Sequence, residues 1–540
     1  MSLMNLLNVG KSALFASQTA LNVTGHNIAN VNTSGYTRQE VVLEIATPAA
    51  NSSGYIGRGV SIAAVKRSYA RFVEGQLLGQ RQNLGRSTAL NEVLSQVEQV
   101  FNDAAGVGLS ESIEAFFGSW QSLTSSPDDA AKRTVLLSDA ESLVSAAKQM
   151  EQDLLDTIGE IDDEIADIAG EVNRLADGIA RLNEQIVRVE AGDSGTSAND
   201  LRDARGALVT ELADLVQLST REDEDGSLTV VVGMRNLVDG TRVNGMTASA
   251  DPSGAVRLEI DGVDVAPRIG KGRVSGLLDA RTAIESGPLK GLRRLAAALT
   301  VEINALHRGG YGLDGSTGND FFSPLTLSST DASAGADVTA ASITDPGALT
   351  LSEYDVTIGA GGAYTVKNRD TGATVATGTF SSGSPIAFDG ISVTLTGTVA
   401  AGDSFSVSPL AGAVSNFGVS ISDTDEIAAA DAASSLPGDN RNALRIAALA
   451  DAGVSTLGNA TVSGYYAGLV TSVGSMAADA SDLQTFDANL HTELANQRDS
   501  ASGVSLDEEA TSLIVYQRAF EAAARLISVT DELLQTVLSL

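Results

Sequence analysis

Cysteine is absent from all 540 residues of this chain, and histidine occurs only three times. The lack of cysteine excludes disulfides, thiolate zinc sites, iron–sulfur clusters and cysteine nucleophiles. His26, His307 and His491 lie far apart in the sequence, which leaves little for metal binding or acid–base catalysis. We therefore expect no metal site, and we interpret each histidine as structural or exposed.

Basic residues are also scarce, because 35 lysines and arginines stand against 68 acidic residues, for a net charge of −33 at pH 7. Phosphate binding needs a basic surface, so neither nucleic acid nor anionic lipid is an expected partner. No apolar run approaches the roughly 18 residues of a membrane-spanning helix, and we expect no membrane insertion. The N-terminus lacks the basic and apolar regions of a cleaved signal peptide.

Three short segments resemble parts of ligand-binding motifs but have the wrong spacing. Gly10-Lys11-Ser12 lacks the first glycine of a phosphate-binding loop, because Asn5 stands at that position. The glycines of 270–276 do not fit a dinucleotide-binding loop, and 223–226 lacks the outer ligands of a calcium loop. A Gly-x-Ser-x-Gly nucleophile motif is also missing. We predict no catalytic residues, no cofactor and no enzymatic activity.

Aromatic residues make up only 4% of the chain, so its apolar content is mostly aliphatic, and it recurs at helical spacing. Both chain ends carry apolar residues every seven positions, the period of a coiled coil. Such seams need a packing partner. We predict that they pack on each other and between subunits, and packing within the monomer alone is the alternative. The seam residues are Leu7, Leu14, Leu21, Ile28, Leu506, Leu513, Phe520, Ile527 and Leu534.

The longest periodic segment runs from Leu136 to Val189, where apolar residues alternate steps of four and three. We expect this helix to end at 192–195 and to pack within its own domain against a returning helix at 197–215. Strand patterns at 219–275 predict a small β insertion, before a helix at 276–308. Residues 321–412, rich in Thr, Ser and Gly, predict an all-β module with its acidic surface in solvent. Another long helix is expected at about 461–500.

Three helix starts carry capping signals. Ser126 followed by Pro127 predicts an N-cap hydroxyl and a first-turn proline for the longest helix. Ser197 with Asp200, and Ser505 with Glu508, have the spacing of capping boxes. Each signal predicts where the helix after it begins.

These patterns predict a multidomain α+β protein with terminal coiled-coil helices and a long helical-bundle body with an inserted all-β domain. Residues 1–60 with 500–540 are predicted to form a terminal helical core domain. Residues 61–320 with 413–499 form the helical-bundle body, which includes the small β insertion at 219–275. Residues 321–412 form the inserted all-β outer domain.

The residues that follow the first helix resemble the N-terminal motif of the bacterial flagellar rod, hook and hook-associated proteins. The motif runs from Ala29 to Tyr36 and includes Asn30, Asn32 and Gly35. Residues 502–509 and 516–522 are similar to the C-terminal motif of that family, although Phe520 stands where the family pattern has tyrosine. Asn304-Ala305-Leu306-His307, the segment 310–322 and residues 438–444 resemble the hook-associated members. The β module is the least diagnostic part.

The resemblance implies a secreted structural subunit of the flagellum at the junction between hook and filament. It implies self-assembly into a short axial ring or zone, with hook protein on one side and a second junction protein or the filament on the other. It also implies export without signal cleavage, an export chaperone, and a place for Asn30, Asn32, Gly35 and Tyr36 at the subunit interface. The alternatives are another axial protein, such as a hook or filament subunit, and a secreted adhesin-like protein on an axial scaffold.

Overall fold

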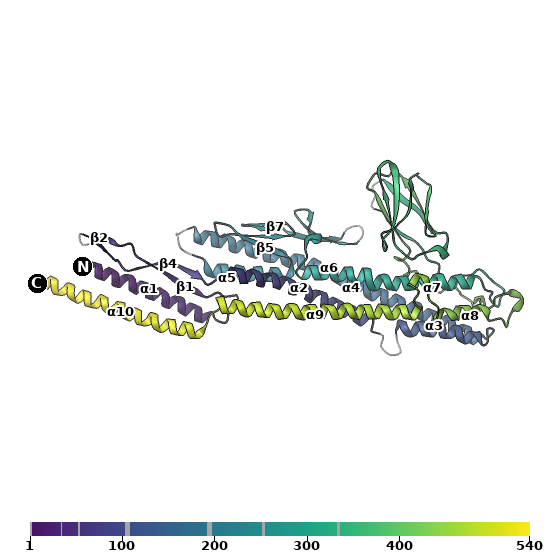
Figure 1. Cartoon of the computed structure of the whole chain (residues 1–540), viewed down its shortest axis with the longest axis horizontal. Helices are drawn as coiled ribbons and strands as arrows, with labels where there is room; N and C mark the ends of the chain where they lie inside the picture. The colour runs from purple at the N-terminus through teal and green to yellow at the C-terminus, as the bar shows by residue number, and fades with distance from the viewer. Residues whose placement is uncertain are drawn as a thin grey trace. The chain divides into compact units, whose positions relative to one another are not determined.

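A computed structural model of the chain describes residues 3–33, 35–51, 54–102, 108–191, 197–250, 254–331 and 335–539. It confirms a multidomain α+β fold in which long helices carry small antiparallel sheets (Figure 1). Two compact units divide the chain. The first contains residues 1–90, 162–278 and 481–540, and the second contains residues 91–161 and 279–480. The boundaries predicted above at 60 and 320 remain predictions.

The chain ends form one antiparallel helix pair in the first unit, with both termini at the same end (Figure 1). The pair consists of α1 (Leu3–Ala29) and α10 (Leu506–Ser539). After α1, a two-stranded ribbon of β1 (Gln39–Ile45) and β4 (Val60–Arg67) runs antiparallel, from the Gln39–Arg67 pair to the Ile45–Val60 pair. Between these strands, β2 (Ala49–Asn51) pairs with β3 (Gly54–Ile56). Residues 39–67 thus form a ribbon and a short hairpin.

Helices from distant parts of the sequence build the remainder of the first unit. A Cβ atom at Gly85 would lie 2.2 Å from the backbone oxygen of Asp214, so glycine permits this close approach. The predicted β insertion forms one four-stranded sheet, in the order β5-β6-β7-β8, and one of three strands, β11-β10-β9. The elements are α2 (Arg71–Val100), α5 (Asn199–Leu215), β5 (Leu218–Glu222), β6 (Leu228–Val232), β7 (Arg235–Asp239), β8 (Arg242–Val243), β9 (Met246–Ala250), β10 (Val256–Ile260), β11 (Val263–Asp264) and α6 (Arg273–Ile284).

The predicted long helix is α4 (Ala130–Glu190), and nearly all of its apolar seam is buried from Leu136 to Ile186. Val189, the last seam residue, is exposed because it lies at the end of the helix. The turn predicted at 192–195 lies outside the described residues. The seam is therefore covered within the chain.

Aromatic side chains fill the core of the second unit. Phe322 lies 4.6 Å from Phe417 and 5.6 Å from Phe116, measured between ring centroids. The Asn304 side chain on α7 holds this segment, because its Oδ1 accepts hydrogen bonds from the backbone N–H groups of Phe321 and Phe322. The surrounding helices are α3 (Leu109–Thr124), α7 (Lys290–Arg308), α8 (Arg441–Ala447) and α9 (Val462–Ser502), and the π-helical turn Glu285–Leu289 precedes α7.

The predicted all-β module belongs to the second unit and has its own core, which includes Tyr354, Val356 and Phe405. Its five-stranded sheet has the order β12-β19-β14-β15-β16, and its three-stranded sheet has the order β13-β18-β17. Ion pairs from Lys290 and Arg294 of α7 to Asp370 connect the module to the helices. Its strands are β12 (Ser328–Asp331), β13 (Ala336–Ile343), β14 (Tyr354–Ile358), β15 (Ala363–Asn368), β16 (Thr374–Thr379), β17 (Pro385–Phe388), β18 (Ile391–Gly397) and β19 (Ser404–Ser408).

The capping predictions were wrong in detail. Asp129, rather than Ser126, caps α4, since its Oδ1 accepts hydrogen bonds from the N–H groups of Ala131 and Lys132. The Ser197 hydroxyl donates to Asn199 Oδ1 instead of capping α5. Glu508, expected in a capping box with Ser505, binds Arg38 instead. For Ser197 and Glu508, a competing polar partner takes the group that the local spacing had assigned to the helix end.

Candidate assembly surface

The face of α1 that packs in the chain is made of small and polar residues. A Cβ atom at Gly10 would lie 2.8 Å from Ile527 Cγ1 of α10, so the two helices approach closely there. From Ser17 to Asn27 the buried positions follow steps of three and four, which keeps them on one side of the helix. They are Gly10, Ala16, Ser17, Ala20, Thr24 and Asn27.

The C-terminal seam predicted for subunit contacts lies on the side of α10 that faces α1. Its residues Leu513, Phe520, Ile527 and Leu534 are half-buried, and Glu509, Ala523 and Thr530 are fully buried on the same side. Leu506, which begins the predicted seam, is 53% exposed. Much of this seam is therefore covered within one chain, and the part that is still accessible lies along the margin of the helix pair.

The N-terminal seam has a similar position on α1. Leu7, Leu14, Leu21 and Ile28 are half-buried, on the flank between the buried face and the exposed face. The exposed face itself is polar except for Met4 and Phe15. These four residues border α10 and can also be reached from outside the pair.

The motif residues after α1 build a turn. Asn30 Nδ2 donates a hydrogen bond to the His26 carbonyl oxygen at 3.0 Å, which caps the helix end. Gly35 has a φ of +78°, a conformation that glycine adopts without strain. Asn32 is exposed, and Ser34 lies outside the described residues. The turn directs Tyr36 back onto α1, where its hydroxyl donates to Asn27 Oδ1 at 2.8 Å.

Asn27 is the centre of a polar network that joins the two ends of the chain. Its Oδ1 accepts from the Gln39 N–H at 3.0 Å, and its Nδ2 donates to the Gln39 carbonyl oxygen and to Glu509 Oε2. Arg38 Nε donates to Glu509 Oε1 at 2.7 Å. Every polar atom of the Asn27 side chain is thus bonded, as its burial requires. We call Asn27, Tyr36, Arg38, Gln39 and Glu509 the Asn27 network.

The electrostatics of the network favour ionised Arg38 and neutral Tyr36. Burial opposes the charge of Arg38, but the hydrogen bond and ion pair with Glu509 outweigh it, so the pKa of Arg38 is raised. Burial, together with the nearby carboxylates of Asp200, Asp203 and Glu509, raises the pKa of the Tyr36 hydroxyl. The Tyr36 hydroxyl therefore remains a hydrogen-bond donor at neutral pH.

A second apolar seam on α10 lies beside the α1 contact, and our sequence analysis missed it. Its larger side chains, Val515, Val529, Leu533 and Val537, are 46–58% exposed. Leu526 is half-buried, and Ala519 and Ala522 are exposed. The signal was present in the sequence as steps of four and three, two residues out of phase with the predicted seam. We call these seven residues the outer seam.

The ribbon also presents an apolar face. Leu43 pairs with Ile62 and Ile45 pairs with Val60, and cross-strand partners point to the same side of a sheet. Ala63 has no partner in β1, so a bulge precedes this part of the ribbon. Leu43, Ile45 and Ile62 are 38–84% exposed. We call Leu43, Ile45, Val60 and Ile62 the ribbon face.

Comparisons with known proteins match the whole chain. The model of the flagellar hook-associated protein FlgK helical domain matches residues 94–322, and that of a D2-like domain of flagellar hook-associated protein 1 matches 327–409. The model of flagella basal body rod protein matches 7–37, and that of the C-terminal part of flagellar basal body rod FlgEFG protein matches 495–540. Flagellar hook-associated protein 1 of Escherichia coli K12 is 30% identical over 99% of this chain and 100% of its own length. The chain belongs to the flagellar hook-associated protein 1 family.

More distant comparisons agree with this membership of the flagellar hook-associated protein 1 family. The Bacillus subtilis member is 26% identical over 99% of this chain and 97% of its own length. The solved structure of the flagellar hook junction protein FlgK from Burkholderia pseudomallei has the same fold, with a TM-score of 0.68. It is 20% identical and covers 80% of this chain and 100% of that one. The chain is therefore a structural component of the bacterial flagellum.

The internal segments that resemble hook-associated proteins are folding determinants of the second unit. His307 is fully buried, and its Nδ1 donates to the Asn319 carbonyl oxygen at 2.8 Å while its Nε2 accepts from the Ala428 N–H at 2.9 Å. Burial lowers the pKa of His307, although the Asn319 hydrogen bond opposes this. A Cβ atom at Gly310 would lie 2.2 Å from Asn442 Nδ2. The two His307 hydrogen bonds hold the chain at Asn319 and at Ala428 against α7.

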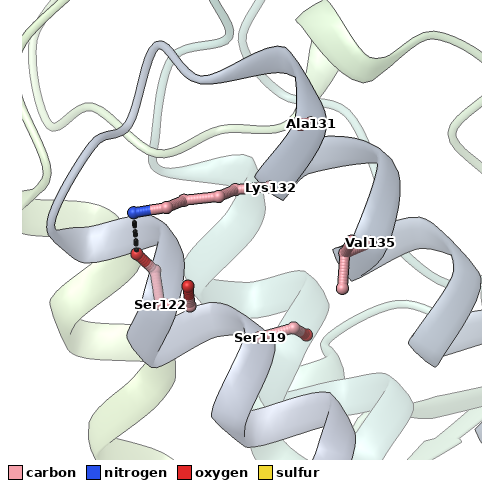
Figure 2. A pocket seen from close by; sticks show the side chains of 5 residues that line it. All are labelled: Ser119, Ser122, Ala131, Lys132 and Val135. Atoms are coloured by element: carbon pink, nitrogen blue, oxygen red, sulfur yellow. Dashed lines mark hydrogen bonds between the residues drawn. The ribbon is translucent and has the colours of Figure 1, made fainter.

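A small cavity lies between α3 and α4. Figure 2 shows a cavity of about 160 Å³ lined by Ser119, Ser122, Ala131, Lys132 and Val135. Lys132 Nζ donates to the Ser122 carbonyl oxygen and to Ser125 Oγ, so it closes a turn. Among the described residues, His, Asp and Glu side chains nowhere gather in threes to form a metal site. The described helices include none long and apolar enough to span a bilayer.

Proposed function

We propose that this flagellar subunit polymerises through its terminal helices into a short ring or zone at the junction between hook and filament. The observation that carries the proposal is the outer seam of α10. Its larger side chains have helical spacing and lie on the flank of α10 beside the α1 contact, where about half of each side chain is exposed. Large exposed apolar patches on proteins mark interaction sites. The half-buried residues Leu14, Leu21, Phe520 and Ile527 at the margin of the helix pair offer further contact area.

The magnitudes favour a polymer over a pair. Burial of the exposed halves of Val515, Val529, Leu533 and Val537 supplies roughly 1 kcal/mol each, or about 4 kcal/mol together. Association costs about 4–15 kcal/mol in lost translational and rotational freedom. A single contact along the outer seam is therefore close to neutral. A subunit that contacts several neighbours at once overcomes the cost, so assembly is cooperative and the free subunit stays monomeric.

The partners follow from the same proposal. The zone contacts hook protein on one side and a second junction protein or the filament on the other. The subunit leaves the cell through the flagellar export apparatus without signal cleavage, and an export chaperone covers its apolar ends before export. Family membership supports these partners. The motif residues Asn30, Asn32, Gly35 and Tyr36 contribute by fixing the direction of the chain at the base of the helix pair.

Replacement of Val529 by Asp tests the role of the outer seam. The charge would have to be buried in an apolar contact, at a cost of several kcal/mol. Cells that carry Val529→Asp as their only copy should secrete the subunit and build hooks without filaments, as seen by electron microscopy. Ser528→Asp is the matched control, because Ser528 is exposed on neither seam. Normal filaments on Val529→Asp cells would contradict the proposal.

A further inference from the structure

The ribbon face is an apolar surface on an element that is unstable by itself. An isolated two-stranded ribbon is marginal in water, and it needs packing on at least one face. Glu44 and Ser61 occupy the polar face, whereas the ribbon face exposes Ile45 to 84%. An isoleucine with this exposure beside three other apolar residues is a stronger signal than scattered surface leucines.

The outer seam is one apolar surface of the same unit that can cover the ribbon face, and within one chain α1 lies between the two. The ribbon contacts α1 at Ser12, whose Oγ accepts from the Val60 N–H at 3.3 Å. The other helix, α10, contacts α1 at Gly10. These two positions point about 200° apart around α1, since each residue turns the helix by about 100°. At this level of α1 the ribbon and α10 thus lie on different sides, whereas at the base of the helix pair Asn27 bonds to both.

We propose that the ribbon face of one copy packs on the outer seam of α10 of a second copy, an inference that rests on the proposed function. The dimensions fit. Leu43 and Ile45 are about 7 Å apart along β1, and Val529 and Leu533 are about 6 Å apart along α10. The charges at the rim also match, because Arg58 is exposed beside Val60 and Glu532 is exposed beside Leu533.

This contact joins two different surfaces of the same molecule. Every copy presents one ribbon face and one outer seam. When two copies bind, one of them still has a free ribbon face and the other a free outer seam, so further copies can add at both ends. Such a heterologous contact produces rings or helical arrays, whereas a contact between identical patches stops at a dimer. The geometry therefore accounts for a zone of many subunits, and it gives the contact a direction along the array.

Cross-linking in isolated flagella tests the contact directly, because the chain has no cysteine of its own. Flagella that carry Ile45→Cys with Val529→Cys should give a ladder of covalent multimers when treated with a short thiol cross-linker. The matched control is Ile45→Cys with Ser528→Cys, in which the second thiol is turned by about 100° around α10 and the ladder should be lost. Dimers from Ile45→Cys alone would overturn the proposal, since they would require ribbon-to-ribbon contact.

A second measurement separates this inference from the proposed function. Ile45→Asp should abolish filaments, whereas Ser61→Asp on the polar face of the ribbon should not. The ribbon contact is wrong if Ile45→Asp cells build filaments, or if Ile45→Cys with Val529→Cys gives no ladder, while Val529→Asp still removes filaments. Assembly through α10 would then remain. If Val529→Asp leaves filaments intact, the proposed function itself is wrong. Circular dichroism of the secreted variants verifies that each chain is folded.

Discussion

Replacement of Arg38 by Ala is the sharpest test of how the two chain ends are joined. Glu509 accepts the Arg38 hydrogen bond at 2.7 Å, and its side chain is only 3% exposed. After the change, Asn27 Nδ2 remains as the side-chain donor to this carboxylate. The buried charge of Glu509 is then incompletely compensated, so we expect the first turn of α10 to separate more easily from the end of α1.

The size of the effect follows from burial. Removal of one partner from a fully buried ion pair costs about 3–5 kcal/mol. The Arg38 side chain is 24% exposed, so water partly screens the pair, and we expect about 2 kcal/mol. That free energy corresponds to a factor of about 30 in the equilibrium for local opening. Glu508→Gln is the matched control, since Glu508 binds the same arginine at 3.0 Å but is 64% exposed. It should cost less than about 1 kcal/mol.

Hydrogen exchange on the secreted monomer measures this opening. Amides in the first half of α10 should exchange about 30-fold faster in Arg38→Ala, and the second unit should be unchanged. The double variant Arg38→Ala with Glu509→Gln should recover most of the protection, because it removes the uncompensated charge. Wild-type protection in Arg38→Ala, or an equal loss in Glu508→Gln, would refute the reasoning.

Three further predictions concern other parts of the chain. Because the folded pKa of His307 is below the ordinary 6.5, the unfolded state binds a proton that the folded state does not, and the melting temperature should fall below about pH 6.5. His307→Gln should weaken that dependence in calorimetry. Gly10→Val should cost about 1–3 kcal/mol by overpacking against Ile527, as measured by hydrogen exchange, and Ile527→Ala should partly restore the loss. Deletion of 323–410 should leave export and filaments intact, because that module has its own core; missing filaments at normal protein level would contradict it.

The sequence determined the helices and the position of the β modules. The period of Leu136–Ile186 requires a long helix with one buried side, and that side is buried in the structure. The Gly- and Thr-rich composition of 321–412 excludes long helices, and strands β12–β19 lie there. The sequence pattern of this module did not reveal strand β13 at Ala336–Ile343. Polar side chains that alternate with small ones conceal that strand.

Polar partners could be found only in the tertiary structure. Glu508 has the spacing of a capping residue, but Arg38 competes for it from 470 positions away. Asn27 is one of many asparagines in the sequence, and its role depends on Tyr36, Gln39 and Glu509 converging on it. Hydrogen bonds between residues far apart in the chain leave no periodic signal, because each needs only one residue at each end.

The two seams of α10 show most clearly what the sequence determined and what the tertiary structure decided. The sequence alone determined that this helix is amphipathic and that Leu513, Phe520 and Ile527 share one side. Tertiary structure decided which side α1 covers, since Gly10 permits close approach at Ile527 and the Asn27 network fixes Glu509 on that side. The outer seam at Val515, Val529 and Leu533 is thereby left exposed. The reason is physical. A heptad pattern predicts that one side of a helix becomes buried, but only the packing determines whether that burial occurs within the chain.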